Sequence, residues 1–288
     1  MWEFESRRRL LDLSVGFVED LRRAGVRPEK SPECLCPAFQ VSFPYRGLFV
    51  QHVDGHEVVC DANQVVVCTR GEVFRLSGPV ADGYSVMIIT PTLDVLSAIM
   101  QRDERAIGNH PLFRRRAWRA DARLLNYRTR LLHRAPRAQE MDVLEAEESV
   151  LGLLRTALHD RHPRRRSHGR STARLIRRTK EFLEAELPNR VRLVDVARAA
   201  GASPTYLTDV FRRVEGVPLH RYLTHLRLAR ALVDLPHTND LTGLALGLGF
   251  SSHSHFSFAF RRAFGATPSQ FREEARRVRV RRAAAMRR

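Results

Sequence analysis

The sequence predicts a multidomain α+β fold, with an antiparallel β-barrel or jelly roll in the N-terminal half, helices flanking it, and an all-α domain after them. Three observations lead to this prediction. Short β-rich runs separated by turn residues fill the stretch from about residue 39 to residue 90. An Arg-rich segment without aliphatic residues, 160–170, follows later. Near the C-terminus, a helical pattern is written twice, about 49 residues apart.

The β-rich stretch is divided by turn signals such as Asp54-Gly55, Arg70-Gly71 and Asp82-Gly83. Many short strands at close spacing indicate an antiparallel barrel or jelly roll. The expected strands are 47–53, 57–60, 64–69, 73–76 and 84–90. Helices are expected at about 120–134 and 139–159. Four leucines of the second helix fall near one face, and we expect them to pair two chains: Leu144, Leu151, Leu154 and Leu158.

The chain is strongly basic, with 49 Lys+Arg against 32 Asp+Glu, a formal net charge of +17 and a pI of about 11.1. Such a charge favours a polyanionic partner. Nearly all the cations are arginine, however, since only Lys30 and Lys180 are lysine. A compositional bias of the genome explains the charge equally well.

No apolar run approaches the roughly 20 residues of a membrane span. Charged residues occupy Met1 to Asp12, where a signal peptide needs an apolar core. We therefore expect a soluble, cytoplasmic protein that does not enter a membrane. The cysteines show no C-x-x-C pair and are interpreted as reduced, mostly buried thiols rather than a metal or redox site: Cys34, Cys36, Cys60 and Cys68.

Each copy of the repeated segment reads as a helix, a Gly-containing turn and a second helix, which is the pattern of a helix-turn-helix reader of the DNA major groove. The offset grows by one residue after the glycine, so the second turn is one residue longer. The first copy contains Leu193, Val196, Ala197, Gly201, Ser203, Leu207, Phe211, Arg212, Arg213, Gly216 and Tyr222. The second contains Leu241, Leu244, Ala245, Gly249, Ser252, Phe256, Phe260, Arg261, Arg262, Gly265 and Phe271.

In the first copy, Ala197 is small enough to let the two helices approach, and Gly201 supplies the turn between them. Ser203 is expected to cap the second helix. Leu207 and Phe211 anchor that helix to the core, as apolar residues at this spacing usually do. The candidate DNA contacts of this unit are Ser203, Thr205, Tyr206, Thr208, Asp209 and Arg212.

The second copy repeats this plan, with Asp240 as the expected cap of its first helix and Ser252 as the cap of its second. Gly249 lies in the turn, and Phe256 and Phe260 are the anchors. The candidate DNA contacts of this unit are Ser252, His253, Ser254, His255, Phe258 and Arg261.

A helix expected over Leu219 to Leu235, ended by Pro236, joins the two units. At about 1.5 Å per residue it spans roughly 25 Å. The bodies at its ends bring the readers near the spacing of about 34 Å between successive major grooves. Three arginines of this helix are candidate phosphate contacts, although ordinary solvated arginines fit the pattern equally well: Arg221, Arg227 and Arg230.

The run Gly249-Phe250-Ser251-Ser252-His253-Ser254-His255-Phe256-Ser257, with Phe260-Arg261-Arg262-Ala263-Phe264-Gly265-Ala266-Thr267-Pro268-Ser269-Gln270-Phe271-Arg272, resembles the signature of the AraC/XylS family of bacterial transcription regulators. Arg227-Leu228-Ala229-Arg230-Ala231-Leu232 resembles the linking helix of that family. The resemblance covers about 173–272 and implies a seven-helix domain with two helix-turn-helix units. Carried over by position, its base-reading sites are Thr205, Thr208 and Asp209, then His253, Ser254, His255 and Phe258.

Two residues depart from the family pattern, because Asp209 and Phe258 stand where members often have arginine. Asp209 is suited to accept a hydrogen bond from a cytosine amine, and Phe258 to contact a thymine methyl group. The alternative is that one or both units only position the protein on DNA.

Family members of this length often carry an N-terminal cupin-like barrel for sensing and dimerisation, and the β-rich stretch is compatible with one. His52, His56 and Glu57 resemble the metal-binding trio of cupin enzymes, but the spacing is imperfect and the glycine frame is incomplete. Surface or hydrogen-bonded histidines are the favoured interpretation, and no metal or cofactor is predicted. A small-molecule pocket inside the barrel is a further expectation.

The expected organisation is a sensing and dimerisation domain over 1–159, a linker over 160–170, a DNA-binding domain over 171–272 and a basic tail over 273–288. We expect a non-enzymatic, sequence-specific transcription regulator that reads two successive major-groove segments. Its expected partners are double-stranded DNA and a second copy of the chain, with RNA polymerase and a small-molecule effector as further candidates. The alternatives are a non-specific architectural DNA-binding protein and a cupin-type metal enzyme fused to a DNA-binding domain.

Overall fold

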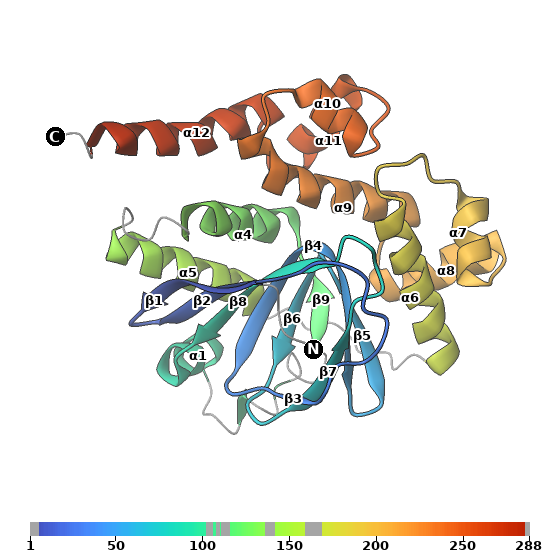
Figure 1. The fold of residues 1–288 in the computed structure, drawn as a ribbon, viewed down its shortest axis with the longest axis horizontal. Coiled ribbons are helices and arrows are strands. Elements are labelled where there is room, and N and C mark those ends of the chain that lie inside the picture. Colours follow the sequence, from blue (N-terminus) through green and yellow to red (C-terminus); the bar gives the residue numbers. More distant parts are fainter. Residues whose placement is uncertain are drawn as a thin grey trace.

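The computed structural model describes residues 6–101, 106–107, 110, 116–135, 142–158 and 169–285, with side chains up to residue 276. An N-terminal β-sheet is followed by helices that lie along one side of it (Figure 1). The strands are β1 (Ser6–Leu13), β2 (Gly16–Arg23), β3 (Cys34–Leu35), β4 (Gln40–Val53), β5 (His56–Asp61), β6 (Gln64–Cys68), β7 (Val73–Ser77), β8 (Tyr84–Pro91) and β9 (Ala117–Arg119).

The described helices before the repeat are α1 (Leu93–Met100), α4 (Ala122–Arg134) and α5 (Val143–Leu158). The C-terminal ones are α6 (Arg170–Ala185), α7 (Leu193–Ala200), α8 (Pro204–Glu215), α9 (Leu219–Asp234), α10 (Leu241–Gly247), α11 (His253–Phe264) and α12 (Pro268–Ala285). None of the helices in the described part of the chain combines the length and the apolar character that a bilayer crossing requires.

The long strand β4 organises the sheet. Its first half pairs with β6 and β8, and its second half pairs with β5 and β7. The register with β8 shifts between Pro44 and Arg46, next to Gly47 with φ +67°. A Cβ atom at Gly47 would collide with the carbonyl oxygen of Gly83, so only glycine allows β4 to pass β8 this closely. The strand therefore bends at this point and belongs to two groups of strands.

The predicted barrel is not closed among the described residues. The strand order β1-β2-β8-β4-β6-β9 leaves β1 and β9 at opposite ends of the path, and β3, β5 and β7 branch from it. Because β4 bends, the two groups of strands share one long strand instead of forming a ring. The fold class is α+β, as predicted, but the prediction of closure was wrong.

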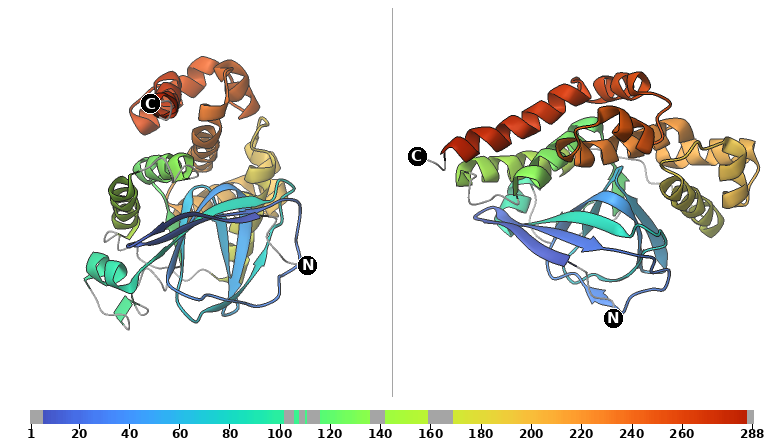
Figure 2. Two further views of the ribbon diagram at one scale, coloured as in Figure 1. Left: turned by 60° about the vertical axis from the view of Figure 1, so that its left-hand side comes forward. Right: turned by 45° about the horizontal axis from the view of Figure 1, so that its top comes forward.

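One continuous apolar core joins the sheet to the helices. It includes Phe43 and Met87 of the sheet, Leu125 of α4, and Phe211 and Phe256 of the repeated segment. Figures 1 and 2 show α4 and α5 between the sheet and the last helices, and α4 contacts both α9 and α11. The N-terminal half therefore packs directly on the repeated segment.

The expected helices over about 120–134 and 139–159 correspond to α4 and α5. The leucine face of α5 does not serve as predicted, because Leu154 and Leu158 are buried inside the chain and Leu151 is partly buried against the same core. Leu144 remains 63% exposed. Most of the linker predicted over 160–170 lies outside the described residues, and α6 begins at Arg170.

Candidate DNA-binding surface

The first repeat folds as a helix-turn-helix. α7 ends at Gly201, whose φ of +70° turns the chain sharply, and Ser203 accepts a hydrogen bond from Tyr206 N at 3.3 Å. Pro204 occupies the first position of α8, where its missing N–H costs nothing. Leu207 and Phe211 are fully buried. Each of these features follows the sequence pattern.

The face of α8 that points away from the core carries the predicted contacts of the first unit. Thr205, Tyr206, Asp209 and Arg212 are exposed, with Tyr206 at 53%. Thr208 is half-buried, and its hydroxyl donates to Thr205 O at 2.9 Å. The structure therefore brings these side chains together on one accessible face, even with the N-terminal half in place.

The second repeat has the same plan. Asp240 caps α10 by accepting from Gly243 N at 2.8 Å, and Ser252 caps α11 by accepting from His255 N at 3.1 Å. Gly249 has a φ of +78° in the turn. Phe256 and Phe260 are fully buried, and their ring centroids are 5.7 Å apart. Aromatic anchors thus hold this reading helix.

The outer face of α11 gathers the predicted contacts of the second unit. Ser254, His255 and Arg261 are exposed, and Phe258 is 67% exposed. The half-buried His253 places Nε2 at 3.4 Å from Ser257 Oγ. The Phe258 ring is therefore accessible on this outer face, and its contact with DNA stays a prediction.

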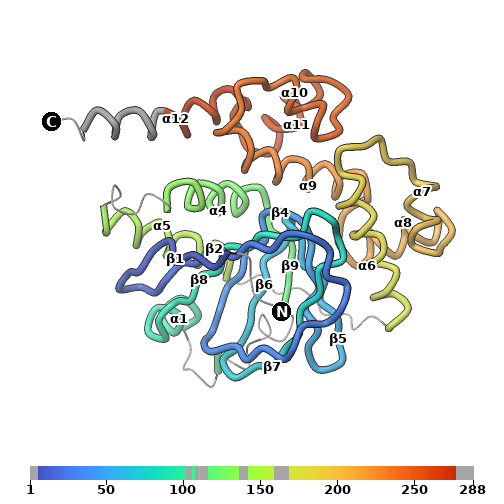
Figure 3. Tube along the Cα trace, viewed as in Figure 1, coloured from blue at the N-terminus to red at the C-terminus, as the bar shows by residue number. Residues whose placement is uncertain are grey.

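The helix α9 separates the two units, which lie at its ends (Figure 3). Its 16 residues span about 24 Å at about 1.5 Å per residue. Arg227 uses Nε and Nη2 to donate to Leu187 O at 3.0 Å and Asn189 O at 2.7 Å, and its guanidinium lies 5.9 Å from the Phe250 ring. It therefore braces the start of the first unit against the second. Its phosphate contact stays a prediction.

A buried polar network connects the sheet to the first unit. Lys180 of α6 lies 2.9 Å from Glu215 of α8 and 3.5 Å from Asp61 of β5. The Tyr222 hydroxyl of α9 donates to Asp61, and Asn63 Nδ2 donates to Tyr222 O at 3.2 Å. The contact between Tyr222 and Asp61 joins residues 161 positions apart. The sequence pattern contained no signal for this network.

Electrostatics favour the charged form of Lys180 and the protonated form of Tyr222 in this network. Burial alone would lower the pKa of Lys180, but the carboxylates of Glu215 and Asp61 outweigh burial and hold that pKa above its ordinary value. Burial, together with Asp61, raises the pKa of Tyr222 well above its ordinary value, so the hydroxyl keeps its proton and remains a donor. The sheet is thus tied to α6, α8 and α9 by charge-assisted hydrogen bonds.

The N-terminal candidates are only partly brought together. His52 lies 2.8 Å from Ser77 Oγ and 3.7 Å from Glu57, while His56 is exposed at the start of β5. Glu57 also pairs with Arg177 at 3.2 Å. Among the described residues, no three His, Cys, Asp or Glu side chains are grouped as metal ligands. All four cysteines are free thiols, and three of them are buried, as predicted.

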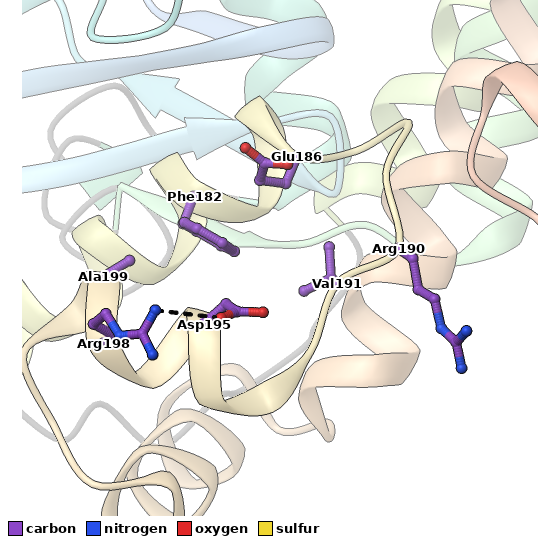
Figure 4. A pocket seen from close by; sticks show the side chains of 7 residues that line it. All are labelled: Phe182, Glu186, Arg190, Val191, Asp195, Arg198 and Ala199. Atoms are coloured by element: carbon purple, nitrogen blue, oxygen red, sulfur yellow. Dashed lines mark ion pairs between the residues drawn. The ribbon is translucent and has the colours of Figure 1, made fainter.

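A pocket of about 400 Å³ lies between α6 and α7 (Figure 4). Phe182 and Val191 line it, and charged side chains including Glu186 and Arg190 stand around it. Arg198 pairs with Asp195 at 3.6 Å at its edge. Because the supporting helices form this pocket, it is not part of the base-reading face of α8.

The C-terminal part of the chain is similar to known regulatory proteins. Residues 196–274 match the family model described as helix-turn-helix domain. The activator AarP of Providencia stuartii is 32% identical over 108 residues, which is 37% of this chain and 80% of AarP. The regulatory protein SoxS of Salmonella typhimurium is 33% identical over 103 residues, 35% of this chain and 96% of SoxS.

A longer relative matches only in part. The regulatory protein PocR of Salmonella typhimurium is 28% identical over 34% of this chain, and the match covers 33% of PocR. A transcriptional regulator from Chromobacterium violaceum with an AraC-type DNA-binding domain, known from its crystal structure, is 29% identical over 35% of this chain and 91% of its own, with a TM-score of 0.34. The repeated segment, its two capped units and the similarity to AarP and SoxS lead to one conclusion. The chain belongs to the AraC/XylS family of transcription regulators.

Proposed function

We propose that the protein regulates transcription by binding two successive major-groove segments of one DNA site, one with α8 and one with α11. The observation that carries this proposal is the pair of separately capped helices whose outer faces are accessible in the full chain. α9 sets their separation, and its length suits successive grooves on one side of the duplex.

The proposed DNA contacts are the exposed side chains of the two helices. In the first unit, Asp209 would select cytosine by accepting from its amine, whereas in the second unit Phe258 would select thymine through its methyl group. The two half-sites would therefore differ in sequence. The remaining proposed contacts are Ser203, Thr205, Tyr206, Thr208, Arg212, Arg227, Ser252, His253, Ser254, His255 and Arg261.

The N-terminal half is proposed to receive a small-molecule signal and to mediate dimerisation in the cytoplasm, and RNA polymerase is a proposed further partner. Its packing on α6, α9 and α11 supports a role in setting the orientation of the readers. We further propose that the bent sheet is related to the cupin fold. The proposed role is non-enzymatic.

Footprinting of the full-length chain on a selected DNA site tests the proposal. Two protected segments one helical turn apart per protomer are expected. Arg261→Ala should weaken protection of one segment, while the matched control Arg262→Ala, at the neighbouring exposed position of α11, should leave it unchanged. Uniform, sequence-indifferent protection with a steep dependence on salt would instead indicate an architectural DNA-binding protein.

A further inference from the structure

A buried arginine without an acidic partner lies between α4 and the sheet. Arg128 projects from the face of α4 that carries its buried leucines, and it is 1% exposed. Its Nη1 atom donates to Pro44 O at 2.6 Å and to Ala62 O at 3.0 Å. Its Nε and Nη2 atoms are buried and have no hydrogen-bond partner in the described part of the chain.

The carboxylates that are buried in the sheet are engaged by other groups. They pair as Glu19 with Arg7, Asp20 with Tyr45 and Arg22, and Asp61 with Lys180 and Tyr222. No ion pair between Arg128 and a carboxylate exists within the described ranges. The guanidinium group therefore donates to two carbonyl groups through Nη1, while its Nε and Nη2 atoms lack an acceptor among the described residues.

This arginine remains charged at neutral pH. Burial lowers the pKa of Arg128 to about 9, which is still above neutrality. A buried charge is strongly disfavoured unless an opposite charge or a full set of hydrogen bonds compensates for it. Arg128 is thus a positive group whose remaining donors an anion would satisfy.

The free edge of the guanidinium group indicates which anion. The N–H groups of Nε and Nη2 lie along one edge of the plane and point in the same direction, so they match the two oxygens of a carboxylate. The neighbouring buried leucines of α4, with Pro44 of β4, are apolar and disfavour a doubly charged phosphate. We propose that Arg128 binds the carboxylate of a small, mainly apolar organic acid.

This site lies next to the contacts between the sheet and the first reader. Ala62, whose carbonyl Arg128 holds, stands between Asp61 and Asn63, and both of these residues contact Tyr222 of α9. An acid bound at Arg128 would therefore act on the segment that positions α9. This assignment rests on the proposed role of the N-terminal half as the part that receives a signal.

Thermal unfolding of the full-length chain without DNA tests the site, with acetate, hexanoate and benzoate as probes at millimolar concentrations. Hexanoate or benzoate should raise Tm by a few degrees in a saturable way, while hexanamide and benzamide should not. Arg128→Met should abolish the shift, and Arg128→Lys, which keeps the charge but loses the planar edge, should reduce it. The control Arg123→Met, at an exposed position of the same helix, should preserve it.

The unliganded variants give a second measurement. If Arg128 only caps two carbonyl groups, Arg128→Met should unfold at a lower temperature than wild type and no carboxylate should shift either protein. Absence of a shift in wild type, an equal shift with the amides, or an equal shift in Arg128→Met would each overturn the site. DNA binding is measured separately on the same preparations, so a failure of the ligand site is distinguishable from a failure of the proposed function.

Discussion

The first helix-turn-helix unit is held against the N-terminal sheet by buried polar groups, whereas the second is held mainly by aromatic rings packed edge-on against one another. Lys180 and Tyr222 tie the first unit to Asp61. In the second unit, the ring centroid of Phe260 lies 4.7 Å from that of Phe264 and 5.8 Å from that of Phe271. The same backbone plan is thus supported in two chemically different ways.

The two kinds of support respond differently to a movement of the N-terminal half. Polar contacts are directional and change with a small displacement of the sheet, while aromatic packing depends mainly on local shape. We therefore expect the orientation of the first unit to respond more strongly to the N-terminal half. The second unit meets that half where α4 packs against α11, with Arg130 and Glu274 forming an exposed ion pair at 2.9 Å beside this contact.

Removal of the buried cation of the first unit should have the largest effect on stability. Lys180→Met leaves Asp61 and Glu215 buried without their positive partner, so it should destabilise the chain by about 3–5 kcal/mol. Urea unfolding measures this change. Lys30→Met, at an exposed lysine, should change stability by less than about 0.5 kcal/mol. Equal, small effects of both variants would show that the network does not hold the first unit.

Removal of an aromatic anchor tests the second unit in the same way. Phe260→Ala opens a cavity among the edge-packed rings and should cost about 3–5 kcal/mol, with loss of only the second protected DNA segment in a footprint. Phe258→Ala is the matched control on the same helix, because its ring is 67% exposed and its loss should leave folding stability unchanged. Loss of both segments in Phe260→Ala would show that this aromatic cluster supports both units and not the second one alone.

The reading faces should differ in specificity. Asp209→Ala should relax base preference at one position of the first half-site, and Phe258→Ala at one position of the second, each by about 1–3 kcal/mol. Competition binding with singly substituted DNA sites measures this. Arg212→Ala should instead weaken binding evenly across sequences. An even loss in Asp209→Ala and Phe258→Ala would mean that these residues only position the protein.

The smallest expected effect is a pH dependence at the contact between α6 and the sheet. Burial, with the nearby charge of Asp61, raises the pKa of Glu184 to about 7, and Glu184 Oε2 has no hydrogen-bond partner among the described atoms. The folded chain therefore holds this proton more tightly than the unfolded chain, and stability should fall as pH rises from about 4.3 to about 7.

Glu184→Gln should remove this dependence and stabilise the chain above pH 7 by on the order of 1 kcal/mol, after allowance for solvent screening. Thermal unfolding across this pH range checks the prediction. If the pH profile of Glu184→Gln follows that of wild type, another group titrates.

The helix-turn-helix units were predictable because their signals are local. Caps at Ser203, Asp240 and Ser252 lie three residues from the N–H groups that they bind, and the anchors repeat at helical spacing. The strands β4 to β8 were predicted from the sequence because turn residues separate them. Only β4 differs by several residues, since it begins at Gln40 and not at Gly47. These features depend on residues close in the sequence.

What could not be predicted depends on distant partners. β1 and β2 carry many charged side chains and do not alternate cleanly, since Glu19 is buried and paired with Arg7 across the strands. The burial of Lys180 and of Arg128 likewise follows from residues far away in the chain. Charged residues on a helix are usually solvated, so nothing in their spacing distinguishes these two.

Selection of binding sites from random DNA by the full-length chain tests whether α8 and α11 read two different half-sites. Two unequal readers on a spacer of fixed length predict a consensus of two different half-sites, centred about 10–10.5 base pairs apart. The same selection with Asp209→Ala should change only one of them. A consensus with a single conserved segment, or the absence of any consensus, would contradict the account.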